Sequence, residues 1–446
     1  MRQPVNRGWR RSPISRLEKT MPDGRSTAHL FEPKLIAVLR EGYGWPSFRA
    51  DVGAGVTVAV VALPLSMAIA VASGVGPERG LYAAIVGGAI VSLLGGSRAQ
   101  IGGPAGAFIV LVSATAARFG IDGLLTAVLM SGVMLSLAGA LRLGSLVRHI
   151  PHAVTVSFTC AIAVTIAASQ LKDLAGLQLA GREPGPLLAK LQALAAAATT
   201  VNLAALAVGV GVGAAILIVR RLRPGWPGML LAVAGASALA AGLHLPVETI
   251  GTHFGAIPGG LPTPSLPRLD PATLLAVAPA AASFTLLGAV ESLLSAKVAD
   301  RMIGRRHRSN MELVAQGVAN VASAMFGGIC VTGTIARTAT NVRAGARSPM
   351  AGILQAAFLL AFMLIAAPLA GYIPLAALAG LLLVVAWNMA ERVEFLRLLK
   401  HGPSAAVVLT TFVVTIAHEL STGIAAGCVV AALLAWLGRP LPEEGD

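Results

Sequence analysis

Long apolar segments recur along most of the chain, and this pattern limits the possible fold more than any other feature of the sequence. From residue 52 to residue 437 they are separated only by short polar gaps. A helix that crosses a bilayer needs about 20 apolar residues. Hydrophobic residues make up 56% of the 446 residues and charged residues only 12%, and so few charges cannot cover the surface of a water-soluble fold. The sequence therefore predicts an all-α polytopic membrane protein.

Fourteen segments are predicted to span the membrane, in two sets of seven separated by a gap rich in Pro and Gly. The predicted spans are 52–73, 80–97, 104–118, 122–141, 152–171, 201–221, 228–244, 272–299, 310–328, 334–345, 349–368, 372–389, 404–419 and 420–437. The predicted domain organisation is an N-terminal cytoplasmic region (1–50), a first seven-span repeat (51–245), a linker (246–271), a second seven-span repeat (272–438) and a tail (439–446).

The positive charges indicate how the chain is oriented. Most of the 34 Lys and Arg residues lie in the first fifty residues and in short gaps between the apolar segments, which is how membrane topology is encoded. With an even number of spans, both termini are predicted on the cytoplasmic side of the cell (inner) membrane. The net charge of +14 therefore does not indicate a nucleic-acid partner. The chain contains no GxxxxGK[ST] loop and no His or Cys residues at metal-binding spacing, so no enzyme activity, cofactor or metal site is predicted.

The two halves of the chain repeat one layout. Spans one to three and eight to ten each consist of a long helix, a helix that ends in Gly-Gly, a few extended residues and a short half-helix. The corresponding stretches read LLGGSRAQIGGPAGAFIV at 93–110 and MFGGICVTGTIARTATNV at 325–342. Because seven is odd, the second copy enters the membrane from the opposite side. Interrupted spans at matching positions of inverted repeats point to the binding site of a secondary transporter.

The half-helices are predicted to form an anion site. Pro104 suits the first position of a helix, which would leave free amides at Gly106 and Ala107, and Thr332-Gly333-Thr334 precedes a second helix that begins near Ile335. Two helix N-termini that face each other attract an anion through their N–H groups and partial positive charge. The alternative is that each Gly/Pro cluster is only a kink packed against a neighbour.

Arg337 and Glu291 are charged residues deep inside predicted spans, on the elements that would form this site. Arg337 lies one turn into the second half-helix, where it could hold a carboxylate, sulfate or bicarbonate with help from Thr334 and Thr338. Glu291 lies in span eight, and a carboxyl group buried in a bilayer favours its protonated form, which suits proton coupling. Ser295 follows on the same helix face. The alternative is a fixed ion pair of Glu291 with Arg337 or Lys297.

With these motifs identified, the chain resembles the SulP family of anion transporters, which is solute carrier family 26 in animals. The resemblance runs from about Phe48 to Leu437 and depends on FRADVGAGVTVAVVALPLSMAIA (48–70), GLYAAIVGG (80–88), GGPAGAF (102–108), SQLKDLAGL (169–177) and ARTATNVRAGARSP (336–349). It implies a 7+7 inverted repeat like that of uracil permeases, a homodimer, a core domain (spans one to four and eight to eleven) and a gate domain (spans five to seven and twelve to fourteen).

The resemblance also assigns residues. Glu291 matches the ion-coupling acid and Ser295 a nearby hydroxyl, and sodium-coupled bicarbonate members carry Asp at the Glu291 position, which favours a proton here. Leu65 and Ile69 stand where many members have Gln and an aromatic residue. Only Gly438 to Asp446 follow the last span, so the family's usual C-terminal STAS domain is expected to be absent. The expected anion-binding positions are Leu65, Ile69, Pro104, Ala105, Gly106, Ala107, Thr334, Ile335, Ala336, Arg337 and Thr338.

The sequence thus predicts a secondary active anion transporter. The favoured interpretation is proton-coupled symport of sulfate or a small dicarboxylate by an elevator-like movement of the core domain. A sodium-coupled bicarbonate symporter, an anion exchanger and a channel-like anion conductor are alternatives, and a nucleobase permease is a more remote one.

Overall fold

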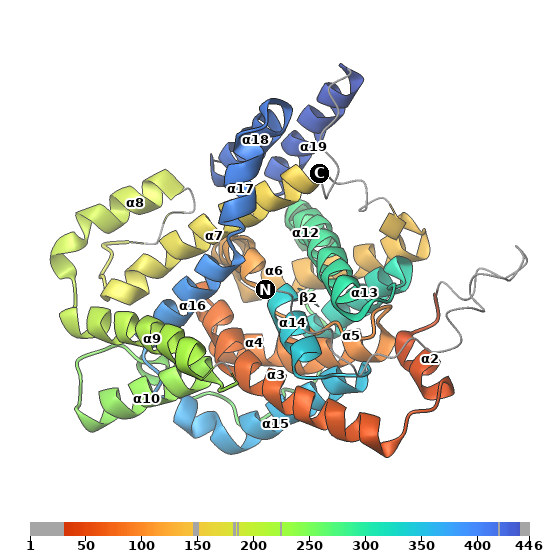
Figure 1. Cartoon of the computed structure of the whole chain (residues 1–446). Helices are drawn as coiled ribbons and strands as arrows, with labels where there is room; N and C mark the ends of the chain where they lie inside the picture. Colours follow the sequence, from red (N-terminus) through yellow and green to blue (C-terminus); the bar gives the residue numbers. More distant parts are fainter. Residues whose placement is uncertain are drawn as a thin grey trace, which may run out of the picture.

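A computed structural model describes residues 31–145, 151–181, 184, 187–223, 225–417 and 420–437 of the chain (Figure 1). The predicted tail at 439–446, the first thirty residues of the N-terminal region and the predicted boundary at His418-Glu419 lie outside the described residues.

The elements of the first half are almost all helical. They are α2 (Lys34–Arg40), α3 (Trp45–Ala72), α4 (Pro77–Tyr82), a π-helical turn (Ala83–Gly87), α5 (Gly88–Leu94), β1 (Gly102–Gly103), a 3₁₀ turn (Gly106–Phe108), α6 (Ile109–Ala140), α7 (His152–Ala175), α8 (Leu187–Ala196), α9 (Leu203–Leu222), α10 (Gly228–Gly242) and α11 (Ile250–Phe254).

The second half repeats the order of a long helix, a shorter helix, a strand and a short helix. Its elements are α12 (Pro271–Ile303), α13 (Ser309–Met325), β2 (Thr332–Gly333), α14 (Ile335–Arg343), α15 (Met350–Ala370), α16 (Leu375–Met389), α17 (Arg392–Leu399), α18 (Gly402–Ala417) and α19 (Leu420–Trp436).

Several of these helices are long and apolar enough to cross a bilayer. Six single helices within the described residues meet this condition, and the bent pair α16–α17 would make a seventh. Shorter apolar helices, among them α10, α18 and α19, lie between them. The chain is therefore an all-helical, multi-span membrane protein, as its apolar segments predict.

Two predicted spans form one helical element with a sharp bend. The segments 104–118 and 122–141 are joined in α6, which bends at Gly120, where φ is 71° and ψ is −175°. A positive φ is readily adopted only by glycine, so Gly120 allows the chain to turn within the helix. The short amphipathic helices α8 and α17 coincide with none of the predicted spans.

The extended residues predicted before the two half-helices are confirmed. Strands β1 and β2 pair antiparallel, with Gly102 opposite Gly333 and Gly103 opposite Thr332. The backbone N–H of Thr334 also donates to the carbonyl of Ile101 at 3.0 Å. The two interrupted segments therefore meet backbone to backbone in the interior of the molecule (Figure 1).

The helices pack in two groups. In one group, α6 packs against α12 and α13, and α3 packs against α14 and α15. In the other group, α16 packs against α7 and α9, and α18 and α19 pack against each other and against α7. Figure 1 shows α8, α9 and α10 on the side of the molecule opposite α2, α5 and α13.

Candidate functional site

A cavity of about 1110 Å³ lies between the two groups of helices. Its wall on one side comes from α3, α12 and the start of α14, and on the other side from α7, α16, α17 and α19. The lining extends from the two strand–helix junctions to charged residues at the ends of α12 and α17. The cavity therefore connects the predicted anion site with one face of the protein.

Most of the residues predicted for the site line this cavity. Ala107, Ser295 and Thr338 are the exceptions, and all three are buried outside the lining. The predicted residues in the lining are Leu65, Ile69, Pro104, Ala105, Gly106, Glu291, Thr334, Ile335, Ala336 and Arg337.

The start of α14 presents backbone donors to the cavity. Its N-cap residue Thr334 has extended dihedral angles and makes no capping hydrogen bond with its side chain. The N–H of Thr338 makes the first bond of the helix, to the Thr334 carbonyl. The amides of Ile335, Ala336 and Arg337 therefore belong to the first turn of the helix, where N–H groups have no intrahelical acceptor.

The start of the first half-helix has a similar construction. The prediction that Pro104 begins this helix is wrong, because Ala105 is extended and the helical turn begins at Gly106. The N–H of Phe108 closes the first turn by donating to the Ala105 carbonyl at 3.1 Å. The amides of Gly106 and Ala107 precede that bond. A side chain at Gly106 would meet the Ile166 Cδ1 atom at 3.1 Å, so glycine keeps the backbone close to α7.

Arg337 is buried between the two junctions, with 1% of its surface exposed. Its Nη2 atom donates to the Pro104 carbonyl at 3.0 Å and to Ser66 Oγ at 3.3 Å. Its Nε and Nη1 atoms are enclosed and have no partner within the described part of the chain. Arg337 nevertheless belongs to the cavity lining, and its direct contact with an anion stays a prediction.

Gly103 makes room for the guanidinium. Its φ is +154°, and a Cβ atom there would lie 2.2 Å from Arg337 Nη1. A Cβ contact this short requires one of the groups to move. The conformation of β1 and the position of Arg337 therefore both depend on a glycine at this position.

Glu291 lines the cavity from α12 without an ion pair. No residue that the structure describes forms a hydrogen bond or salt bridge with its carboxylate. This includes Arg337 and Lys297, the two partners considered in the prediction. The alternative of a fixed ion pair is thus absent from this conformation. A charged group in an apolar wall is costly unless it has a partner.

Ser295 and Thr338 contact each other instead of the cavity. Their hydroxyl oxygens lie 3.2 Å apart, and Thr338 Oγ1 accepts a hydrogen bond from the Ile101 N–H at 3.0 Å. Thr334 Oγ1 donates to the Ile101 carbonyl at 3.3 Å. These hydroxyl groups therefore attach α14 to the residue before β1.

A side-chain clamp on the second junction was not predicted from the sequence. Asn320 on α13 is fully buried, its Oδ1 accepts from the Val331 N–H at 2.8 Å, and its Nδ2 donates to the Val331 carbonyl at 2.8 Å. Ser292 Oγ then accepts from the Gly333 N–H at 3.2 Å. An amide side chain inside an apolar span was the available signal, because buried polar groups in membrane helices are rare without a role.

Comparison with known proteins gives a consistent result. The sulfate permease family model matches residues 48–415. The Bacillus subtilis protein YvdB, provisionally named a sulfate transporter, is 41% identical over 397 residues, which cover 88% of this chain and 74% of that protein. The structure resembles the transmembrane domain of the cyanobacterial bicarbonate transporter BicA, with a TM-score of 0.76, 29% identity and coverage of 86% of this chain and 98% of that one. It also resembles murine solute carrier 26 family member A9 in an inward-facing state, with a TM-score of 0.83, 18% identity and coverage of 95% and 74%.

Proposed function

The chain belongs to the sulfate permease family of anion transporters, and on this basis we propose that it is a secondary active carrier that binds its anion at the two strand–helix junctions. One observation carries the proposal. Two sets of first-turn amides and a buried guanidinium without a carboxylate partner converge at the inner end of one cavity. An anion bound there would be the counter-charge that Arg337 lacks among the described residues.

The proposed arrangement in the membrane is fourteen spans in a 7+7 inverted repeat. The repeated order of helix, helix, strand and half-helix supports it, as does the pairing of the two strands. In this arrangement α3 to α6 and α12 to α15 form the core domain, and the remaining spans form the gate domain. Both termini then lie in the cytoplasm, and the charged mouth of the cavity opens on the same side.

Transport would proceed by an elevator-like movement of the core against the gate. The cavity runs along the boundary between the two helix groups, so a displacement of one group would carry the anion with it. A dimer formed through the gate domain would keep that domain still.

We propose Glu291 as the proton-coupling residue. Its carboxylate faces the cavity without a fixed partner, and it lies on the core side together with Arg337. Sulfate and small dicarboxylates are the proposed substrates. Bicarbonate with sodium is the second candidate, because a bicarbonate transporter is among the similar structures.

The test is uptake by purified protein in liposomes. Labelled sulfate, succinate, fumarate and bicarbonate are supplied with an inward proton gradient, with a sodium gradient or with neither. We expect accumulation of sulfate or a dicarboxylate driven by the proton gradient, loss of uptake in Arg337→Gln, and loss of the pH dependence in Glu291→Gln. The matched control Arg343→Gln removes an exposed arginine from the other end of α14 and should transport normally.

Two results would contradict parts of the proposal. Accumulation driven by sodium alone would replace the proton by sodium. Normal uptake by Arg337→Gln, in protein with an unchanged thermal midpoint, would remove the anion site from the junctions.

A further inference from the structure

A second group of arginines lies outside the cavity, at one end of the gate-side helices. Arg220 and Arg221 lie in the last turn of α9, and Arg223 is the residue that follows this helix. Arg392 is the first residue of α17. All four side chains are exposed, and none forms an ion pair with a described carboxylate. Glu391, which precedes α17, and Glu394 within it both line the cavity. This part of the surface therefore carries positive charge that the described protein does not neutralise.

Two of these arginines are held in place by one dipeptide. The Nη1 atom of Arg220 donates to Asn388 Oδ1 at 2.8 Å. The guanidinium of Arg392 lies 3.5 Å from the centre of the Trp387 ring. Because Trp387 and Asn388 are consecutive residues at the end of α16, they fix both guanidinium groups on the same short stretch of chain. Because these two arginine side chains are already held in one position, less conformational entropy is lost when a ligand binds.

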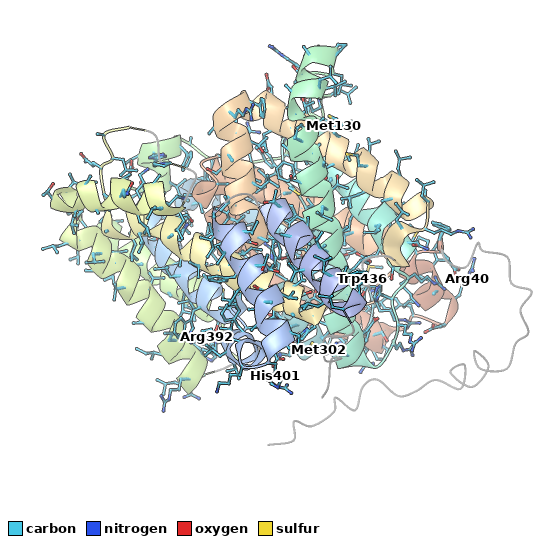
Figure 2. All side chains as sticks on the ribbon, turned by 90° about the horizontal axis from the view of Figure 1, so that it is seen from above. Arg40, Met130, Met302, Arg392, His401 and Trp436 are labelled. Atoms are coloured by element: carbon cyan, nitrogen blue, oxygen red, sulfur yellow. The ribbon has the colours of Figure 1, made fainter. Side chains whose placement is uncertain are left out.

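Large apolar side chains are exposed around this pair. Leu222, Trp226, Trp387, Val393 and Leu396 are between 58% and 84% exposed. The axis of α17 is bent by 43° from that of α16. Figure 2 shows Arg392 near the same edge of the molecule as His401 and Met302. A short helix with cations and exposed apolar residues at the end of a spanning helix is typical of the bilayer interface.

We propose that Arg220, Arg221, Arg223, Trp387 and Arg392 form a binding site for the phosphate headgroup of an anionic phospholipid. Guanidinium groups bind phosphate oxygens through paired hydrogen bonds, and basic clusters next to spanning helices attract anionic lipids. The exposed Leu222, Val393 and Leu396 would contact the acyl chains. Asn388, which holds Arg220, also lines the transport cavity, so the proposed lipid site is connected to the cavity wall through this residue.

Native mass spectrometry of the full-length protein in detergent tests the proposal. The protein is titrated with phosphatidylglycerol or with phosphatidylcholine, and the fraction carrying one bound lipid is measured. We expect preferential binding of phosphatidylglycerol. The double variant Arg220→Gln/Arg392→Gln should weaken it about 25-fold, which corresponds to about fivefold for each arginine.

The matched control is Arg343→Gln/Arg347→Gln, which removes the same charge from two exposed arginines on the core side. It should change phosphatidylglycerol binding less than about twofold, because these arginines lie outside the site. Equal binding of the two lipids by the wild type, or equal weakening by the two double variants, would overturn the proposal. Displacement of the lipid by millimolar inorganic phosphate would also overturn it, since the site would then be one for free phosphate.

Discussion

Replacing Gly103 by alanine should displace Arg337 without removing its charge. The added Cβ atom would lie 2.2 Å from Nη1 and 3.2 Å from Cζ of that arginine. Unbonded heavy atoms are stable at about 3.5 Å or more, so the guanidinium must move by more than about 1 Å. Its Nη2 atom would then lose its hydrogen bonds to Pro104 and Ser66, which are 3.0 and 3.3 Å long.

The expected cost has two parts. A non-glycine residue at this positive φ costs about 1–2 kcal/mol, and loss of a hydrogen bond to a charged group costs about 1.5–3 kcal/mol. If the displaced charge also weakens anion binding by about 1.4 kcal/mol, the KM for the anion rises about tenfold. Gly103→Ala should therefore lower both the thermal midpoint and the apparent affinity.

Two other glycines separate these effects. Gly120 has a φ of +71° with nothing within 4 Å of the added Cβ, so Gly120→Ala carries the backbone cost alone. Gly211 lies in α9 with open space around it, so Gly211→Ala should be neutral or stabilising. The assay is initial uptake against anion concentration in liposomes, together with melting in detergent. If Gly103→Ala melts earlier than Gly120→Ala but keeps the wild-type KM, the position of Arg337 does not set anion affinity.

Three further substitutions test the described contacts. Asn320→Leu leaves the N–H and C=O groups of Val331 without partners, and each unpaired group costs about 1–3 kcal/mol of stability. The thermal midpoint should therefore fall, and an unchanged midpoint would show that the clamp is dispensable. Gln355 is fully buried, and neither of its amide atoms has a hydrogen-bond partner among the residues that the structure describes. Gln355→Met should therefore melt at the same or a higher temperature, and a lower midpoint would mean that the amide is satisfied in solution. Burial raises the pKa of Glu41, but Arg98, Arg305 and Lys34 together lower it by more than burial raises it. The pKa of Glu41 therefore lies below the usual 4.5. The stability that Glu41 contributes is therefore complete above pH 4.5 and is lost as the pH falls through the lowered pKa. Glu41→Gln should lower the melting temperature at pH 7 and have a smaller effect in acid. An equal effect at both pH values would contradict this prediction.

The sequence predicted the positions of the helices well because each apolar segment carries its own signal. Gly102 and Thr332 lie in the extended stretches expected before the half-helices, and ten of the predicted site residues share one cavity. The amphipathic helix α17 was not predicted, because a search for apolar segments of spanning length passes over eight residues with three charges.

The directions of individual side chains could not be predicted from spacing. Thr334 and Thr338 lie four residues apart, which places both on one helix face, but the amide of Ile101 takes up the Thr338 hydroxyl from the other half of the chain. Arg337 lies in the cavity wall, but its Nη2 atom donates to the carbonyl of Pro104, an acceptor that the sequence around Arg337 does not indicate. Both outcomes depend on residues far away in the sequence, and a local pattern contains no information about them.

The pairing of β1 with β2 has a consequence for biosynthesis. While the ribosome is still making the second half, the amides and carbonyls of Gly102 and Gly103 have no strand to pair with, and hydrocarbon offers them no substitute. The newly made first half must therefore keep this stretch in water, within the insertion machinery or against a chaperone until β2 arrives. The last step of assembly is then the joining of two unfinished halves, and the proposed anion site does not exist before it.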